Sequence, residues 1–106
     1  MRLAPLLLLC AACGSDVEYR VTGDATTARV GYFDGSGFLG QKFYEGPLPF
    51  DVGVDLEDGA LAYVSAISVD TVTRTITCEI WQDGRMLTRE TLTGIREVVG
   101  CTAELE

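Results

Sequence analysis

The sequence predicts an all-β fold, an antiparallel β-sandwich of seven or eight short strands. Apolar and polar residues alternate in nearly every segment from residue 16 onward, and no stretch keeps helical spacing for long. Turn-forming pairs, of which Asp58-Gly59 and Asp83-Gly84 are the clearest, separate these segments at regular spacing. Many short alternating segments divided by such turns are typical of antiparallel sandwiches.

Length and composition limit the classes of function. A chain of 106 residues is one small domain, and a hydrophobic fraction of 47% is enough for a core. The chain contains no histidine, which removes the commonest general base and the commonest metal ligand. Its formal net charge of −8 would repel phosphate backbones, so we expect no nucleic-acid partner. We also expect no cofactor.

The N-terminus has the pattern of an export signal. Met1-Arg2 is positively charged, and the apolar run Leu3–Ala12 is much shorter than a membrane-spanning helix. The small residues Ala11-Ala12 directly precede Cys13, an arrangement that resembles the lipobox of bacterial lipoproteins. We therefore expect a signal peptide over residues 1–12 and a lipid on Cys13.

The alternatives for the N-terminus are cleavage by the ordinary signal peptidase or an uncleaved anchor. Cys10 occupies the position where a lipobox usually has leucine. With lipid on Cys13, residues 13–16 would form a tether and residues 17–106 the folded domain. The domain would be exported and held by its lipid anchor at the extracytoplasmic face of a cell-envelope membrane.

Cys78 and Cys101 are the two cysteines left in the folded domain, and we expect them to form a disulfide. Such a bond would stabilise a small domain by about 3 kcal/mol if it acts through loop-closure entropy. The alternative is a pair of buried thiols. A redox or metal role is disfavoured because the chain lacks both a Cys-x-x-Cys motif and histidine.

The first three predicted strands lie before two prolines. Val17–Val21 and Ala28–Tyr32 each place alternate apolar residues on one face, as a half-buried strand does. Phe38–Tyr44 is less regular and is followed by Pro47 and Pro49. Proline has no N–H for a sheet ladder, so we expect this third segment at an edge or in a loop.

The remaining strands make up the C-terminal half. Phe50–Leu56 has the cleanest alternation in the chain, whereas Leu61–Val69 is apolar on both faces and is expected in the centre of a sheet. Val72–Gln82 and Arg85–Thr93 should form a hairpin, and Ile95–Ala103 closes the domain. Cys78 in Val72–Gln82 and Cys101 in Ile95–Ala103 each lie on the same face of their strand as the aliphatic residues expected to be buried.

Several segments are similar to conserved parts of MmpS-type transport accessory proteins, and together they cover nearly all of the mature chain. They are Tyr19–Ala25 with Ala28–Tyr32, Leu48-Pro49-Phe50 before Asp58-Gly59, and Ile76-Thr77-Cys78 with Asp83-Gly84 and Val98–Cys101. The resemblance implies an immunoglobulin-like β-sandwich with one disulfide, located outside the cytoplasmic membrane. It also implies partnership with large RND-type exporters of lipids or siderophores. The family members carry an uncleaved transmembrane helix where this chain has a lipobox.

Asp51, Asp55, Glu57 and Asp58 place four carboxylates near one turn, and calcium binds such oxygen clusters. Strand alternation, however, puts the first three on a solvated face, and EF-hand spacing is absent. No two acids are marked as a catalytic pair. We therefore expect neither a metal site nor an enzyme.

Four aromatic residues are candidates for contact with a partner: Trp81, Phe38, Phe43 and Tyr44. The alternative for each is packing over a sandwich edge. The expected function is that of a non-catalytic accessory or adaptor domain for an envelope transporter or another envelope protein. The alternative function is a stand-alone binding module for a small apolar or glycan ligand.

Overall fold

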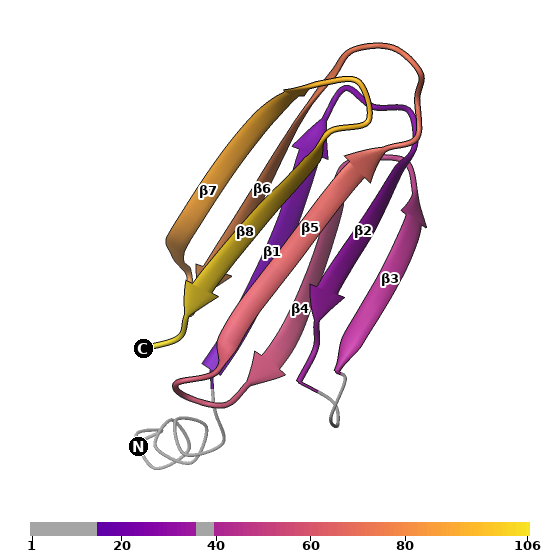
Figure 1. Cartoon of the computed structure of the whole chain (residues 1–106). Coiled ribbons are helices and arrows are strands. Elements are labelled where there is room, and N and C mark those ends of the chain that lie inside the picture. Colours follow the sequence, from indigo (N-terminus) through magenta and orange to yellow (C-terminus); the bar gives the residue numbers. More distant parts are fainter. Residues whose placement is uncertain (1–14, 36–39) are drawn as a thin grey trace.

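The computed structural model describes residues 15–35 and 40–106, and these residues contain eight strands and no helix (Figure 1). The predicted signal peptide (residues 1–12), Cys13 and Phe38 lie outside the described residues. The strands are β1 (Ser15–Gly23), β2 (Ala28–Phe33), β3 (Gln41–Gly46), β4 (Phe50–Leu56), β5 (Leu61–Ser68), β6 (Arg74–Gln82), β7 (Arg85–Gly94) and β8 (Val98–Glu104).

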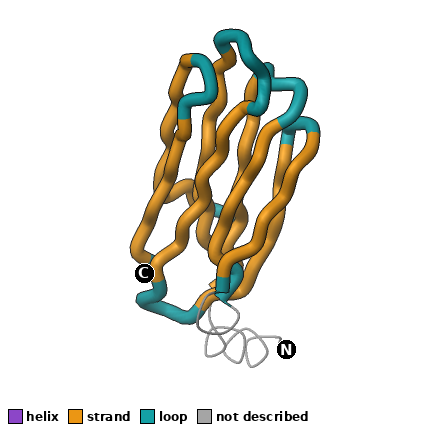
Figure 2. Tube along the Cα trace, turned by 45° about the vertical axis from the view of Figure 1, so that its right-hand side comes forward, coloured by secondary structure: helices purple, strands orange, loops and turns teal. Residues whose placement is uncertain are grey.

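The strands form two four-stranded antiparallel sheets that pack face to face. Sheet A has the order β4-β1-β6-β7 and sheet B the order β3-β2-β5-β8. Figure 2 shows the connecting loops gathered at the two ends of the sandwich. The predicted immunoglobulin-like sandwich is confirmed, and its strand count is eight. The segment expected in the centre of a sheet is β5, which lies between β2 and β8.

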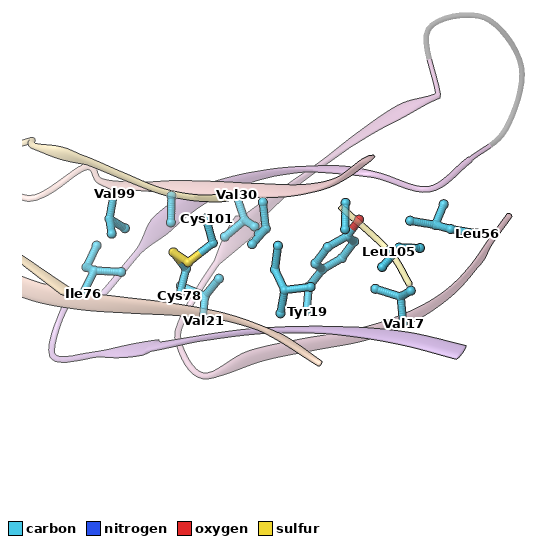
Figure 3. Close-up of a cluster of buried hydrophobic side chains, with 14 of the residues drawn as sticks. Val17, Tyr19, Val21, Val30, Leu56, Ile76, Cys78, Val99, Cys101 and Leu105 are labelled. Carbon is cyan, nitrogen blue, oxygen red and sulfur yellow. A yellow bond between two sulfur atoms is a disulfide. The ribbon is translucent and has the colours of Figure 1, made fainter. Parts of the chain in front are cut away.

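The core lies between the sheets and is formed by inward residues of alternate positions (Figure 3). In β5 and β6 every second residue is buried, so the sequence alternation and the burial coincide. The predicted disulfide is confirmed: Cys78 of β6 and Cys101 of β8 are bonded, with their Cα atoms 6.1 Å apart. Because β6 belongs to sheet A and β8 to sheet B, this bond joins the two sheets through the core.

Tyr19 makes a second link between the sheets. Its ring starts from β1 in sheet A and is fully buried, and its hydroxyl reaches sheet B. There it donates to the Phe33 carbonyl oxygen over 2.8 Å and accepts from the Tyr63 N–H over 3.3 Å. The β2–β5 ladder ends one residue earlier, at Tyr32 opposite Val64. The hydroxyl therefore satisfies two backbone groups at the point where β2 and β5 cease to pair.

The turns and edges follow from the residues that form them. Asp83 and Gly84 have φ values of 50° and 82°, as the predicted two-residue hairpin requires. β3 is an edge strand, as its following prolines indicate, and the Leu48-Pro49 peptide bond is cis.

Several strand boundaries differ from the prediction: β3 runs over Gln41–Gly46 and β8 over Val98–Glu104, each later in the chain than expected. β1 begins at Ser15, so strand pairing with β4 extends into the segment expected to be a tether. β6 begins at Arg74, which leaves Val72 exposed in the preceding loop. In the part of the chain that the structure describes, no helix has the length and hydrophobicity to span a membrane.

Candidate binding surfaces

The two outer faces of the sandwich differ in chemistry. The outer face of sheet A is polar, with threonines at its β6–β7 side and carboxylates at its β1–β4 side. The outer face of sheet B carries mainly apolar and small residues. Of the predicted partner-binding residues that the structure describes, Trp81 lies on the outer face of sheet A and Phe43 on that of sheet B, so they do not form one site.

Trp81 lies on the outer face of sheet A, opposite Glu18 of β1 in the β1–β6 register. The Arg20 guanidinium lies over its ring, with Cζ 4.4 Å from the ring centroid. The indole N–H donates to a Glu79 carboxylate oxygen over 2.8 Å. Trp81 is therefore half-buried and held in one orientation by two charged neighbours, rather than freely exposed.

Arg20 connects Trp81 to the carboxylates of β1 and β4. Its guanidinium donates to both oxygens of Glu18, over 2.8 and 3.1 Å, and lies 3.8 Å from an Asp51 oxygen. The hydrogen bond from Arg20 is the main reason that the pKa of Glu18 is lowered, and a hydrogen bond with Asp51 lowers it further. Partial burial is the main reason that the pKa of Asp51 is raised, and the hydrogen bond with Glu18 and the negative charge of Glu18 raise it further. One guanidinium thus lies between two carboxyl groups, and Glu18 keeps the negative charge more strongly.

A hollow of about 440 Å³ opens beside Trp81 on this outer face, and we call it the acidic groove. Four carboxylates line it, from Asp16 and Glu18 of β1 and from Asp51 and Asp55 of β4. The rest of the lining comes from Trp81, from Gly84 in the β6–β7 turn, and from Val17 of β1 and Gly53 and Val54 of β4.

The four acids singled out in the sequence are divided by the structure. Asp51 and Asp55 lie in β4 and line the acidic groove, whereas Glu57 and Asp58 follow the end of β4 and are exposed in the turn to β5. In residues 15–35 and 40–106 no group of three or more acidic or cysteine side chains is placed to hold a metal ion.

Phe43 lies on the outer face of sheet B and is the most exposed large apolar residue of the described chain, with 77% of its surface accessible. We call the surrounding surface the apolar face. Its apolar side chains come from all four strands of sheet B: Phe33, Phe43, Leu61, Tyr63, Ile67 and Val98.

The apolar face has a definite relief. Phe33 and Tyr63 are neighbours across β2 and β5, with ring centroids 5.1 Å apart. The row beside this pair consists of small residues, with Gly31 opposite Ser65 and Ser65 opposite Gly100. The Phe43 ring and the Gln41 side chain lie over Gly31, whereas no atom lies within 4 Å of a Cβ built on Gly100. The backbone of the sheet is therefore open to a partner on the β8 side of this row.

Charge is nearly balanced on the apolar face. The charged side chains there are Arg29, Glu45 and Glu104, and the first two form an ion pair of 3.1 Å. A smaller hollow of about 250 Å³ lies between this ion pair and Phe43.

Tyr44 does not lie on either outer face. Its ring packs inward against Phe50, with centroids 4.5 Å apart, and its hydroxyl donates to the Pro47 carbonyl over 2.8 Å. Tyr44 therefore packs over an edge of the sandwich, which was the alternative considered for all four aromatic residues. The residues that sequence reasoning missed are the partners of Trp81, because Arg20 and Glu18 reach it only through the β1–β6 register.

Comparison with known proteins finds no family whose sequence pattern matches this chain and no curated protein that matches it.

Proposed function

We propose that this protein is a non-catalytic adaptor domain of the cell envelope that docks on another envelope protein through the apolar face of sheet B. It is exported and held at a membrane by a lipid on Cys13. The partner that the MmpS-type resemblance favours is an RND-type transporter. The observation that carries the proposal is the exposure of Phe43 on a face with almost no net charge.

The buried disulfide and the N-terminal pattern support the location. Cys78 and Cys101 are bonded inside the core, and such bonds persist in oxidising compartments. Two residues span at most about 7 Å of chain, so a lipid on Cys13 would hold the Ser15 end of β1 close to the membrane surface. That end of the sandwich also carries the β4–β5 turn (Figure 1).

The charge distribution supports docking through sheet B. Five carboxylates and two guanidinium groups lie on the outer face of sheet A, and this excess of negative charge disfavours burial against another protein. On the apolar face, burying a phenylalanine side chain such as Phe43 contributes about 1.5 to 3 kcal/mol without that cost. Exposed aromatic residues in an apolar surface are typical anchors of protein interfaces.

The second candidate is a binding module for a small apolar or glycan ligand. The hollow beside Phe43 is its best apolar site, but at about 250 Å³ it is smaller than the roughly 300 to 1,000 Å³ of most ligand pockets. The acidic groove is larger, at about 440 Å³, but four carboxylates line it and do not suit an apolar ligand. An open apolar sheet face fits a protein surface better than it encloses a small molecule.

The experiment is site-specific photo-crosslinking in the cell from which the protein comes. A benzophenone amino acid replaces Phe43 on the apolar face or, as the matched control, Thr91 on the outer face of sheet A. We expect position 43 to capture an integral membrane transporter and position 91 to capture little of it. Equal capture at both positions, or no transporter at position 43, would contradict the proposal.

The anchor is tested separately with Cys13→Ala, which should move the protein from the membrane fraction to the aqueous fraction. An unchanged membrane fraction would show that lipid on this residue is not what holds the protein.

A further inference from the structure

β8 is an edge strand of sheet B, and its free edge has none of the features that block the addition of another strand. Edge strands are usually protected by proline, by charged residues or by a charge that points into the sandwich. β3 has Lys42 on its inward side, and β4 begins directly after Pro49. From Val98 to Ala103, by contrast, β8 contains neither a charged residue nor a proline. No described strand pairs with this edge, so its backbone is available to another chain.

Sheet B stops short of the inner face of β7. The core-facing residues of β6, namely Ile76, Cys78 and Ile80, are at most 3% exposed. Residues directly opposite each other in two paired strands lie on the same face of a sheet. Yet Leu92, opposite Ile76, is 38% exposed, and Glu90, opposite Cys78, is exposed too. Figure 1 shows β7 at the margin of the sandwich, beyond β8. The inner face of β7 is therefore uncovered where a fifth strand of sheet B, beside β8, would lie, and we call this place the strand slot.

The inner residues of β7 set the chemistry of the strand slot. Glu90 lies at its centre, with Leu92 two residues away on one side and Thr88 on the other. No ion pair among the described residues includes Glu90. A strand added to β8 would turn every second side chain toward these residues. Charge complementarity then favours a lysine or arginine facing Glu90, and apolar contact favours an apolar residue facing Leu92.

A second copy of this chain fits the strand slot poorly. Pairing of β8 with β8 of another copy would bring the two β7 strands together, because β7 lies beyond β8 (Figure 1). The two Glu90 carboxylates would then approach each other, and each copy carries a formal net charge of −8. A single extended segment enters the slot without this overlap.

We propose that an extended segment of the partner protein adds to the free edge of β8 as a fifth strand of sheet B, with a basic residue facing Glu90 and an apolar residue facing Leu92. In strand addition the main-chain hydrogen bonds supply affinity and the alternate side chains supply specificity. The strand slot borders the apolar face at Val98, which is 59% exposed, so the two surfaces form one continuous interface. The inference rests on the proposed function and adds how the partner is held and which residues it presents.

The test uses the full chain purified in detergent and a labelled peptide, acetyl-Thr-Val-Thr-Lys-Thr-Val-Thr-amide, followed by fluorescence anisotropy at about 0.15 M salt. The peptide reads the same in both directions, so either strand orientation places valine, lysine and valine on one face. Glu90→Lys should weaken binding about tenfold, because it turns an attraction into a repulsion, and it should bind the peptide in which glutamate replaces lysine. The matched control, Glu57→Lys, makes the same change of charge in the exposed turn after β4 and should change binding less than about twofold.

Main-chain pairing is tested with two N-methylated forms of the same peptide. Successive N–H groups of a strand point to opposite edges, so methyl groups on one alternate set block pairing with β8 and methyl groups on the other set point away from it. One form should lose binding and the other should keep it. Equal effects of the two methylation patterns would overturn strand addition.

Three other results would also overturn the proposal. They are an equal loss of binding in Glu90→Lys and Glu57→Lys, no binding of the unmethylated peptide by wild type up to about 1 mM, and a wild-type dimer in analytical ultracentrifugation that Glu90→Lys changes and the peptide does not disperse. The last result would place a second copy in the strand slot.

The peptide assay and the crosslinking assay fail separately. Peptide binding without capture of a transporter at position 43 would reject the proposed function and leave the strand slot in place. Capture at position 43 without peptide binding would reject strand addition and leave docking through the apolar face in place.

Discussion

Removing one oxygen atom from Tyr19 tests how the two sheets are held together. The change Tyr19→Phe keeps the buried ring but deletes the hydroxyl that bonds Phe33 and Tyr63. Each lost hydrogen bond contributes about 0.5 to 1.5 kcal/mol, and the two backbone groups stay buried under the core. We therefore expect a loss of about 2 kcal/mol in the free energy of unfolding. For a domain of this size that lowers the melting temperature by about 8 to 16 °C.

The assay is urea unfolding followed by the fluorescence of Trp81, the one tryptophan of the chain. The matched control is Tyr32→Phe. The Tyr32 ring packs 5.7 Å from the Tyr19 ring, but its hydroxyl makes no hydrogen bond within the described residues. We expect this control to change stability by less than about 0.5 kcal/mol. A Tyr19→Phe variant as stable as the control would refute the bridging role.

The pH dependence of the stability of wild type and of Tyr19→Phe gives a second check. Burial, opposed by the Tyr63 N–H and assisted by the charge of Asp34, raises the pKa of Tyr19 from 10.0 to about 12. A raised pKa means that the stabilisation is complete below pH 10 and is lost as the pH rises toward 12. The loss is about 3 kcal/mol for a two-unit shift. The advantage of wild type over Tyr19→Phe in the free energy of unfolding should therefore fall from pH 9 upward and be lost by about pH 12. A constant difference would contradict the buried hydroxyl.

Three further predictions concern other parts of the fold. The double variant Cys78→Ala/Cys101→Ala should lose about 3 kcal/mol of unfolding free energy, measured with urea. The folded wild type should not react with a thiol reagent until a reductant is added, and reaction without reductant would contradict the buried disulfide. Hydrogen bonds from Thr26 lower the pKa of Asp70, so Asp70→Asn should be less stable than wild type at pH 6. The difference in the free energy of unfolding should vanish as the pH falls below 3.8, the ordinary pKa of an aspartate. A difference that persists at pH 2 would exclude this role. Gly23→Ala should lose about 1 to 3 kcal/mol on thermal unfolding, because its Cβ would collide with a neighbouring backbone carbonyl, and wild-type stability would show that β1 can shift to accept it.

The sequence was sufficient for the strands and for the disulfide. Alternation of apolar and polar residues is a local property of the chain, so the periodicity of Phe50–Leu56 is also the burial pattern of β4. The positive φ values of Asp83 and Gly84 were likewise predictable, because the turn depends on those two residues alone. Cys78 and Cys101 could be paired because they were the two cysteines left after the N-terminal segment.

The sequence did not show which residues of different strands would meet. Phe43 and Tyr44 are adjacent in the chain, yet alternation sends one to solvent and the other into the core edge, and only strand pairing decides which. Trp81 could be assigned to an outward position, but its contact with Arg20 depends on the β1–β6 register.

The tertiary structure alone also decided the relation between the two surfaces. The acidic groove exists because β1 and β4 pair in a register that sets Asp16 opposite Asp55 and Glu18 opposite Gly53. The apolar face exists because β3, β2, β5 and β8 assemble in an order that the chain does not follow. Local alternation fixes which face of each strand is buried, but which strands pair, and with what offset, is set by the packing of the whole core.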